Sequence, residues 1–185
     1  GVQPNAEELA SLPMVKSIQS LTDARLEALT MVARDVIEAA AVLGTDFSPE
    51  ALSQVTGSNP LEVGIALEEL ERRRLVALEQ RTPGNLRYRF IHDIFREALV
   101  LKIHPVRARW LHARTAQYLE SGPETRDKPA LLAQHYEEAG ETGMALGYWI
   151  QSGQRAHQLY SFQEADWAFS RAESLIDPGR APDEL

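Results

Sequence analysis

Hydrophobic positions in the N-terminal third of the chain recur at helical spacing. Over residues 15–29 and 31–43, apolar side chains fall three and four residues apart, which places them on one face of an α-helix. Gly44 follows the second stretch and fits a helix C-cap, because glycine adopts unusual backbone conformations without strain. Residues 1–13 are polar and end in Leu12-Pro13, so we expect a leader there rather than a helix.

Two capping signals follow. Ser48-Pro49 and Asn59-Pro60 each combine an N-cap residue with proline, which is tolerated at the first helical position because its missing N–H needs no partner there. They predict a short helix as far as Val55 and a longer one from Pro60. The longer helix should end in Arg72-Arg73-Arg74, whose positive charges suit a helix C-terminus.

The period of the pattern then changes. Leu75–Glu79 and Leu86–Ile91 are typical of strands, and Thr82–Asn85 is typical of the turn between them. Two helices followed by a hairpin is the element order of a winged helix, which we expect over residues 14–104. A helix over 92–103 should complete it, with its buried side formed by Ile91, Ile94, Phe95, Ala98 and Leu101.

His104-Pro105 marks a boundary, after which the pattern is helical throughout. The predicted helices span about 106–120, 129–139, 142–159 and 162–176. Within the last two, small and aromatic residues fall at offsets typical of tetratricopeptide repeats: Trp149, Gly153, Ala165, Phe169 and Ala172. We therefore expect a mostly α protein, a winged helix (helices plus one β-hairpin) followed over 105–185 by a linker helix and the start of a tetratricopeptide-like α-solenoid built of helical hairpins.

Composition narrows the functional class. The net charge is −8 with 44% hydrophobic residues, and cysteine is absent, which fits a cytoplasmic protein. We expect no membrane span and no signal peptide, because no apolar run is long enough. The histidines have no metal-site spacing, and no P-loop or nucleophile motif is present, so we expect neither a metal centre nor catalysis in this chain.

His92-Asp93 is the candidate ligand site. The pair lies where a strand gives way to a helix, and a helix N-terminus favours negative charge through its exposed N–H groups and its dipole. His92 could therefore contact a phosphate. The alternative is purely structural: Asp93 stabilises the first turn of the helix, and His92 covers the hairpin.

Basic residues around the hairpin suggest DNA binding as an alternative. The candidate contacts to DNA or to another domain are six arginines: Arg72, Arg73, Arg74, Arg81, Arg87 and Arg89. However, the helix that would enter the major groove begins at Pro60 and carries Glu62, Glu68 and Glu69, whose carboxylates would repel phosphates. We therefore expect these arginines to be solvated or paired with glutamates.

The aromatic residues and histidines of the second half are expected to serve packing. Helix-spaced tryptophans usually pack in a core, so we expect Trp110, Trp149 and Trp167 to be buried. We expect His112 and His135 to pack or to form hydrogen bonds rather than to bind a ligand.

The order of these motifs resembles bacterial STAND-type regulatory ATPases, which include large LuxR-type transcriptional regulators and ATPase-linked class III adenylyl cyclases. The resemblance covers nearly all of residues 13–176. Five segments carry it: Arg34–Gly44 with Phe47, Leu67–Val76, Tyr88–Ala98, Leu111–Leu119 and Leu132–Gly140.

The resemblance implies a division of labour. In these ATPases an NTPase core upstream carries the P-loop and binds ATP or ADP, while the winged helix closes on that core. In related apoptotic and plant immune ATPases, the histidine of a Met-His-Asp motif contacts the β-phosphate of ADP. Ile91-His92-Asp93 matches this motif at His92 and Asp93 and keeps an apolar first residue.

The sequence thus predicts a non-catalytic regulatory part of a STAND-type ATPase, needing no cofactor of its own. Its partners would be the intramolecular NTPase core, and a protein or small ligand on the helical repeats. The alternatives are a DNA-binding winged-helix regulator and a tetratricopeptide-like scaffold without a nucleotide role.

Overall fold

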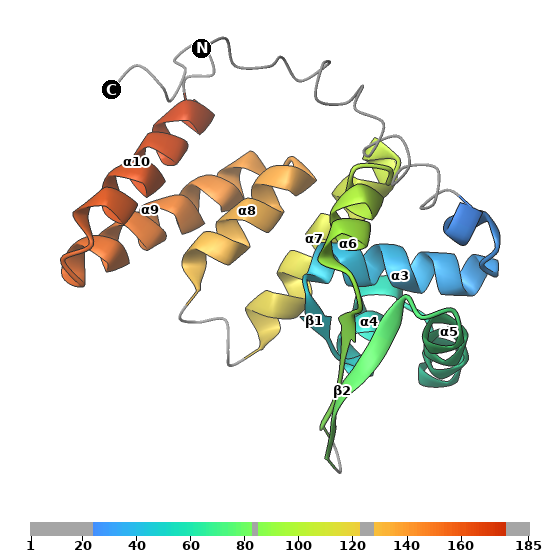
Figure 1. Ribbon diagram of the computed structural model, residues 1–185. Helices are drawn as coiled ribbons and strands as arrows, with labels where there is room; N and C mark the ends of the chain where they lie inside the picture. The colour runs from blue at the N-terminus through green and yellow to red at the C-terminus, as the bar shows by residue number, and fades with distance from the viewer. Residues whose placement is uncertain (1–23, 83–84, 123–127, 177–185) are drawn as a thin grey trace, which may run out of the picture. The chain divides into compact units, whose positions relative to one another are not determined.

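The computed structural model describes residues 24–82, 85–122 and 128–176, and this part of the chain is mostly helical with a small antiparallel sheet (Figure 1). The chain divides into two compact units, Gly1–His104 and Pro105–Leu185. The predicted leader at 1–13 and most of the helix predicted at 15–29 lie outside the described residues, and only its end, at 24–27, is seen as helix.

The first unit follows the predicted order of elements, with one strand added. Its elements are α3 (Met31–Leu43), β1 (Asp46–Phe47), α4 (Pro49–Thr56), α5 (Pro60–Arg72), β2 (Val76–Thr82), β3 (Asn85–Phe90) and α6 (Asp93–Val100). Both predicted capping signals are confirmed. The Ser48 hydroxyl accepts from the Ala51 N–H at 3.1 Å, and Asn59 forms a capping box with Glu62.

The sheet has the strand order β1-β3-β2 in the described part of the chain, and both pairings are antiparallel. Figure 1 shows β2 and β3 as a long twisted ribbon. Thr82 pairs with Asn85, flanking the turn predicted at Pro83-Gly84, which lies outside the described residues. The sequence missed β1, because two residues have no periodicity to detect. Phe47 in β1 is nevertheless buried, with its ring 5.7 Å from that of Phe90.

The predicted buried side of α6 is partly wrong. Phe95 and Leu99 are buried, whereas Ile94 is 53% exposed and Leu101 is 86% exposed. The helix packs against α3 and β3 through one narrow stripe, with buried residues four positions apart. Ile91 and Leu101 lie outside the eight-residue helix, so helical spacing that runs through them does not give its buried side.

A buried carboxylate joins α3 to α5. Glu69 is 6% exposed and accepts from the Thr30 hydroxyl at 2.6 Å and from the Thr30 N–H at 3.2 Å. Arg73 donates to the same carboxylate at 3.2 Å and also to the Ala28 carbonyl. The Thr30 hydroxyl is the main cause of the lowered pKa of Glu69, with smaller contributions from the Thr30 N–H and Arg73. Arg73 therefore has a structural role here.

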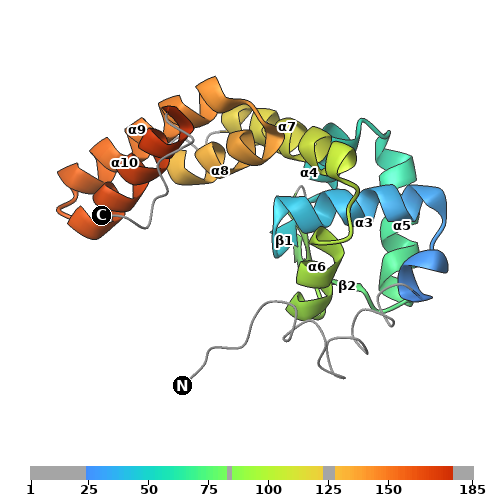
Figure 2. The same ribbon diagram turned by 90° about the horizontal axis from the view of Figure 1, so that it is seen from above.

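The second unit is a succession of antiparallel helices, each packed on the next: α7 (Pro105–Ser121), α8 (Pro129–Ala139), α9 (Thr142–Gln158) and α10 (Phe162–Ile176). These helices confirm the predicted segments, and α9 and α10 lie side by side in both views (Figure 2). Small residues dominate the core: Ala116, Ala133, Tyr136, Ala145, Trp149, Ala168 and Ala172. Alanine allows helix axes to approach closely, and Tyr136 and Trp149 fill the remaining space.

Helices α9 and α10 make a close contact at Gly153. A Cβ atom added at Gly153 would lie 2.6 Å from Cε1 of Phe169, so the ring occupies the space of a missing side chain. Ala165 and Ala172, on the same helix as Phe169, are buried as the spacing predicts. This contact explains the spacing of glycine and phenylalanine noticed in the sequence.

Gly153→Ala should lower the free energy of unfolding of the second unit by about 1 kcal/mol, because overpacking costs about 1–3 kcal/mol and the gain in helix propensity only about 1 kcal/mol. All three tryptophans lie in this unit, so urea unfolding followed by tryptophan fluorescence reports on it.

The matched control is Gly147→Ala on the same helix, where an added Cβ has nothing within 4 Å. This change should raise stability by about 0.5–1 kcal/mol, because alanine restricts the unfolded chain more than glycine does. Equal effects of the two substitutions would contradict the close contact with Phe169.

Candidate functional site

The strand-to-helix junction places His92 and Asp93 at the start of α6. His92 is the N-cap residue in an extended conformation (φ −134°, ψ 115°), and its side chain makes no capping hydrogen bond. Asp93 lies in the first helical turn, and both residues are exposed. The ring of His92 is thus accessible to a surface that approaches this helix end.

A hollow of about 350 Å³ adjoins this junction, and its lining excludes His92: Thr45, Asp46, Glu79, Arg89, Phe90, Ile91 and Asp93. The carboxylates outnumber the single guanidinium, and Arg89 already pairs with Glu79 at 3.6 Å. A phosphate would be repelled from this hollow. Phosphate contact by His92 stays a prediction that requires a second surface to hold the nucleotide.

Within the residues that the structure describes, three of the six arginines of the hairpin region pair with neighbouring carboxylates, and Arg89 is the first of them. Arg73 binds Glu69 as described above, and Arg87 lies 3.8 Å from Asp46. Arg72, the last residue of α5, and Arg74, just after the helix, are both exposed. Arg81 lies in β2, and its side chain is outside the described part of the chain. These residues therefore form no continuous basic surface in the described structure.

The outward face of α5 is apolar and acidic. Leu61 is 73% exposed and Ile65 is 58% exposed, one helical turn apart. Glu62 and Glu68 are exposed on the same helix. This face offers hydrophobic contact and negative charge to a partner.

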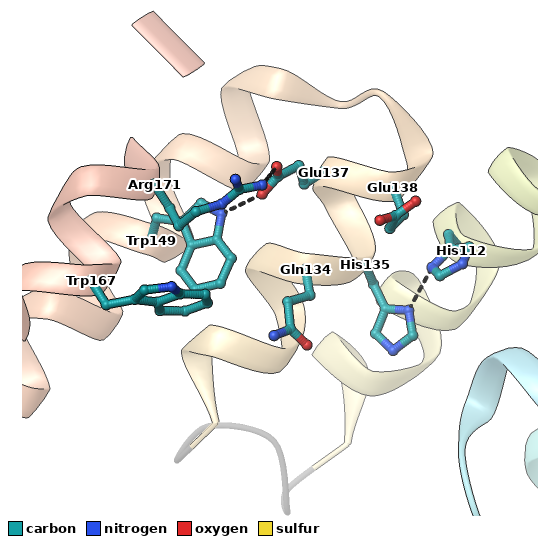
Figure 3. Close-up of a pocket in the computed structure, with 8 residues that line it drawn as sticks. All are labelled: His112, Gln134, His135, Glu137, Glu138, Trp149, Trp167 and Arg171. Atoms are coloured by element: carbon teal, nitrogen blue, oxygen red, sulfur yellow. Dashed lines mark hydrogen bonds and ion pairs between the residues drawn. The ribbon is translucent and has the colours of Figure 1, made fainter. Parts of the chain in front are cut away.

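A larger hollow, of about 570 Å³, lies in the second unit (Figure 3). Helices α7 to α10 all contribute to its lining: His112, Gln134, His135, Glu137, Glu138, Trp149, Trp167 and Arg171. No sequence pattern indicated this site, because its residues are far apart in the chain. The spacing of Trp149 and Trp167 was visible, but it indicated packing only.

Glu137 organises one side of this hollow. Its carboxylate accepts from the indole N–H of Trp149 at 2.8 Å and pairs with the guanidinium of Arg171. The ring of Trp167 stands nearly perpendicular to that of Trp149, with the centroids 4.9 Å apart. Figure 3 shows the two indoles and Arg171 grouped at one end of the hollow.

The prediction that all three tryptophans are buried is correct only for Trp149. Trp149 is 1% exposed, whereas Trp167 is 52% exposed and Trp110 is 40% exposed. Trp110 lies beneath two guanidinium groups, with Arg107 at 4.9 Å and Arg114 at 6.0 Å from its ring. Cation–π contact thus takes the place of a hydrophobic core around Trp110.

The opposite end of the hollow carries a histidine pair, which confirms the predicted hydrogen-bonding role. Nδ1 of His112 lies 3.0 Å from Nδ1 of His135, joining α7 to α8. One Nδ1 must carry the proton and the other must accept it. In the neutral pair, one ring therefore has an acceptor at Nε2 and the other a donor.

Burial keeps this pair uncharged. Desolvation is the main cause that lowers the pKa of His135 to about 4, with a further contribution from His112. Burial also lowers the pKa of His112, while the nearby charge of Glu138 raises it in opposition. At neutral pH the two rings therefore add no positive charge to the hollow.

Comparison of the chain with protein-family models, with curated proteins and with solved structures gave no match. Among the described residues, no group of three or more histidine, aspartate or glutamate side chains is arranged to hold a metal ion. None of the described helices combines the length and apolarity needed to cross a bilayer.

The histidine pair makes the stability of the second unit pH-dependent. In the unfolded chain the pKa of His135 returns to about 6.5, so between pH 6.5 and 4 the unfolded chain binds more protons than the folded chain. The contribution of neutral His135 to the free energy of unfolding is complete above pH 6.5 and is lost as the pH falls from 6.5 towards 4. We expect the free energy of unfolding to drop by about 2 kcal/mol between pH 7 and pH 5.

Urea unfolding at pH 7, 6 and 5, followed by tryptophan fluorescence, measures this drop. His135→Gln should flatten the pH dependence, because glutamine does not titrate, while His157→Gln, at an exposed position, should leave it intact. The same pH slope in His135→Gln and in the unsubstituted chain would disprove the assignment.

Proposed function

We propose that the chain is a non-catalytic regulatory module of a STAND-type ATPase. In this proposal the first unit is a winged helix that docks on a nucleotide-bound ATPase core. The second unit is a tetratricopeptide-like α-solenoid that receives a partner or ligand. ATP or ADP belongs to the core, and the module operates in the cytoplasm.

The topology supports a winged helix. Helices α4 and α5 are joined by the short segment around Gly57, which adopts a left-handed conformation (φ 77°) suited to a tight turn. The β2–β3 hairpin follows directly, and β1 adds to its edge. In a winged helix, α5 is the helix that would contact DNA.

The outward face of α5 is the observation that carries the proposal. Leu61 and Ile65 expose apolar side chains where a DNA-binding helix needs hydrogen-bond donors and positive charge. Glu62 and Glu68 would in addition repel phosphates. Burying this face against a protein surface removes apolar area from water, which is favourable. A protein therefore suits this face better than DNA does.

The helical hairpin α9–α10 supports the second half of the proposal. Gly153 on one helix receives the ring of Phe169 from the other, flanked by buried Ala165 and Ala172. These are the positions that a tetratricopeptide-like repeat assigns to close helix contact. Such repeats bury their faces against neighbouring repeats and present a surface to partners.

Ile65→Lys in the full-length protein should speed ADP release by about tenfold or more, because burying one aliphatic side chain contributes about 1.5–3 kcal/mol to docking. Dissociation of a fluorescent ADP analogue measures the rate. Leu159→Lys, another exposed apolar position but in the second unit, is the matched control and should leave the rate unchanged.

The proposal also requires a P-loop in the same polypeptide, and His92→Ala should raise the rate of ADP release. An unchanged rate in both Ile65→Lys and His92→Ala would contradict docking of the first unit on the core.

Fluorescence anisotropy of labelled duplex DNA at low salt tests the DNA-binding alternative. We expect no binding by the 185-residue chain. Binding that falls with salt and is lost in Arg72→Ala and Arg74→Ala would instead favour a DNA-binding regulator.

A further inference from the structure

The hollow of the second unit has an unbalanced charge. Among the described residues that line it, Arg171 is the only permanent cation, and it is engaged by Glu137. Glu138 is exposed; in the part of the chain that the structure describes it has no hydrogen bond or ion pair, and its charge acts on the neighbouring His112. The histidine pair remains neutral near pH 7. One negative charge is therefore left for a ligand to neutralise.

The opposite end of the hollow offers an aromatic surface. Trp167 is 52% exposed, and its ring is held by the edge-to-face contact with Trp149. An indole face is the strongest cation–π acceptor among side chains. Trp149 cannot turn away, because its N–H is bound to Glu137. Trp167 is therefore a preorganised platform for a flat or positively charged group.

Figure 3 shows Trp167 and Glu138 at opposite ends, with Gln134 between them. Gln134 is exposed and can both donate and accept hydrogen bonds. The volume of about 570 Å³ is typical of small-ligand sites. The hollow thus suits an extended ligand. Such a ligand could place a cationic group near either end of the hollow and an alkyl chain between the ends.

An anionic ligand fits this lining less well. It would face the carboxylate of Glu138, and it would have to displace Glu137 from Arg171. A purely apolar ligand would leave the Glu138 and Gln134 side chains desolvated without partners, which is unfavourable.

We propose that this hollow binds an organic cation, an ammonium or guanidinium group on an extended chain, between Trp167 and Glu138. A free polyamine and a lysine or arginine side chain of a protein partner share this chemistry. In the proposed function the second unit receives a partner or ligand, and the bound cation would be that ligand. To that extent the cation site rests on the proposed function.

Isothermal titration of the 185-residue chain at about 150 mM salt tests the proposal. Spermidine represents a free polyamine, and end-blocked Gly-Lys-Gly and Gly-Arg-Gly tripeptides represent protein side chains. We expect binding by at least one probe with a dissociation constant below about 1 mM. The probe with the tighter affinity identifies the source of the cation.

Two substitutions locate the bound cation. Glu138→Gln should weaken binding about fivefold, because it removes the uncompensated charge but keeps the shape of the side chain. Trp167→Leu should weaken binding about five- to tenfold, because it keeps an apolar side chain but removes the aromatic face. Far-UV circular dichroism confirms that each variant retains its helices.

The matched control is Glu173→Gln, at an exposed glutamate of α10 that does not line the hollow. Because the chain carries a net charge of −8, any cation is attracted nonspecifically, and this control should keep the affinity within about twofold. An equal loss in Glu138→Gln and Glu173→Gln would overturn the site.

Absence of heat with every probe up to about 10 mM would also overturn it, as would full affinity in Glu138→Gln and Trp167→Leu. Because the titration uses this chain without an ATPase core, such a failure would remove the cation site and leave the docking of α5 untouched. A failure of the ADP-release experiment would likewise leave the cation site standing.

Discussion

The packing of helices in the second unit depends on the polar contacts of one carboxylate, that of Glu137. It extends from α8, accepts from the indole of Trp149 in α9 and pairs with Arg171 in α10, so one side chain connects three successive helices. Trp149 is the largest fully buried side chain of the described structure, and its hydrogen bond fixes the orientation of its ring. Without Glu137, a buried indole N–H and a guanidinium would both lose their partner, a loss that typically costs more than the bond itself contributes.

A second carboxylate repeats this arrangement one helix earlier. Glu120 at the end of α7 accepts from the hydroxyl of Tyr136 in α8 at 2.7 Å and from the hydroxyl of Tyr148 in α9. The two tyrosine rings are stacked, with centroids 5.6 Å apart. These bonds lower the pKa of Glu120, so the carboxylate holds its charge and its partners over the physiological range. These polar contacts, each shared between successive helices, thus fix how the helices are aligned. The alanines of the core are too small to specify that alignment alone.

Local chemistry explains which parts of the structure were predictable. The N-caps at Ser48 and Asn59 and the glycine contact at Gly153 depend on residues close in sequence or at a fixed repeat offset, and the structure shows them as expected. The two-residue strand β1 and the buried stripe of α6 are set by tertiary packing, so no local pattern indicated them. No local pattern indicated the hollow in the second unit either, since Glu138 and Trp167 come to line the same hollow only when four helices assemble.

The two surfaces proposed for binding share one chemical character. The outward face of α5 combines Leu61 and Ile65 with glutamates, and the hollow combines Trp167 with Glu138. Hydrophobic or aromatic contact beside exposed carboxylates selects partners that are apolar and positively charged, and it repels nucleic acid at both places. A cation in the hollow could regulate docking only if it bound the docked and released states with different affinity. The ratio of the two cation affinities equals the factor by which the cation changes docking, so titrations in the presence and absence of the core would measure the coupling directly.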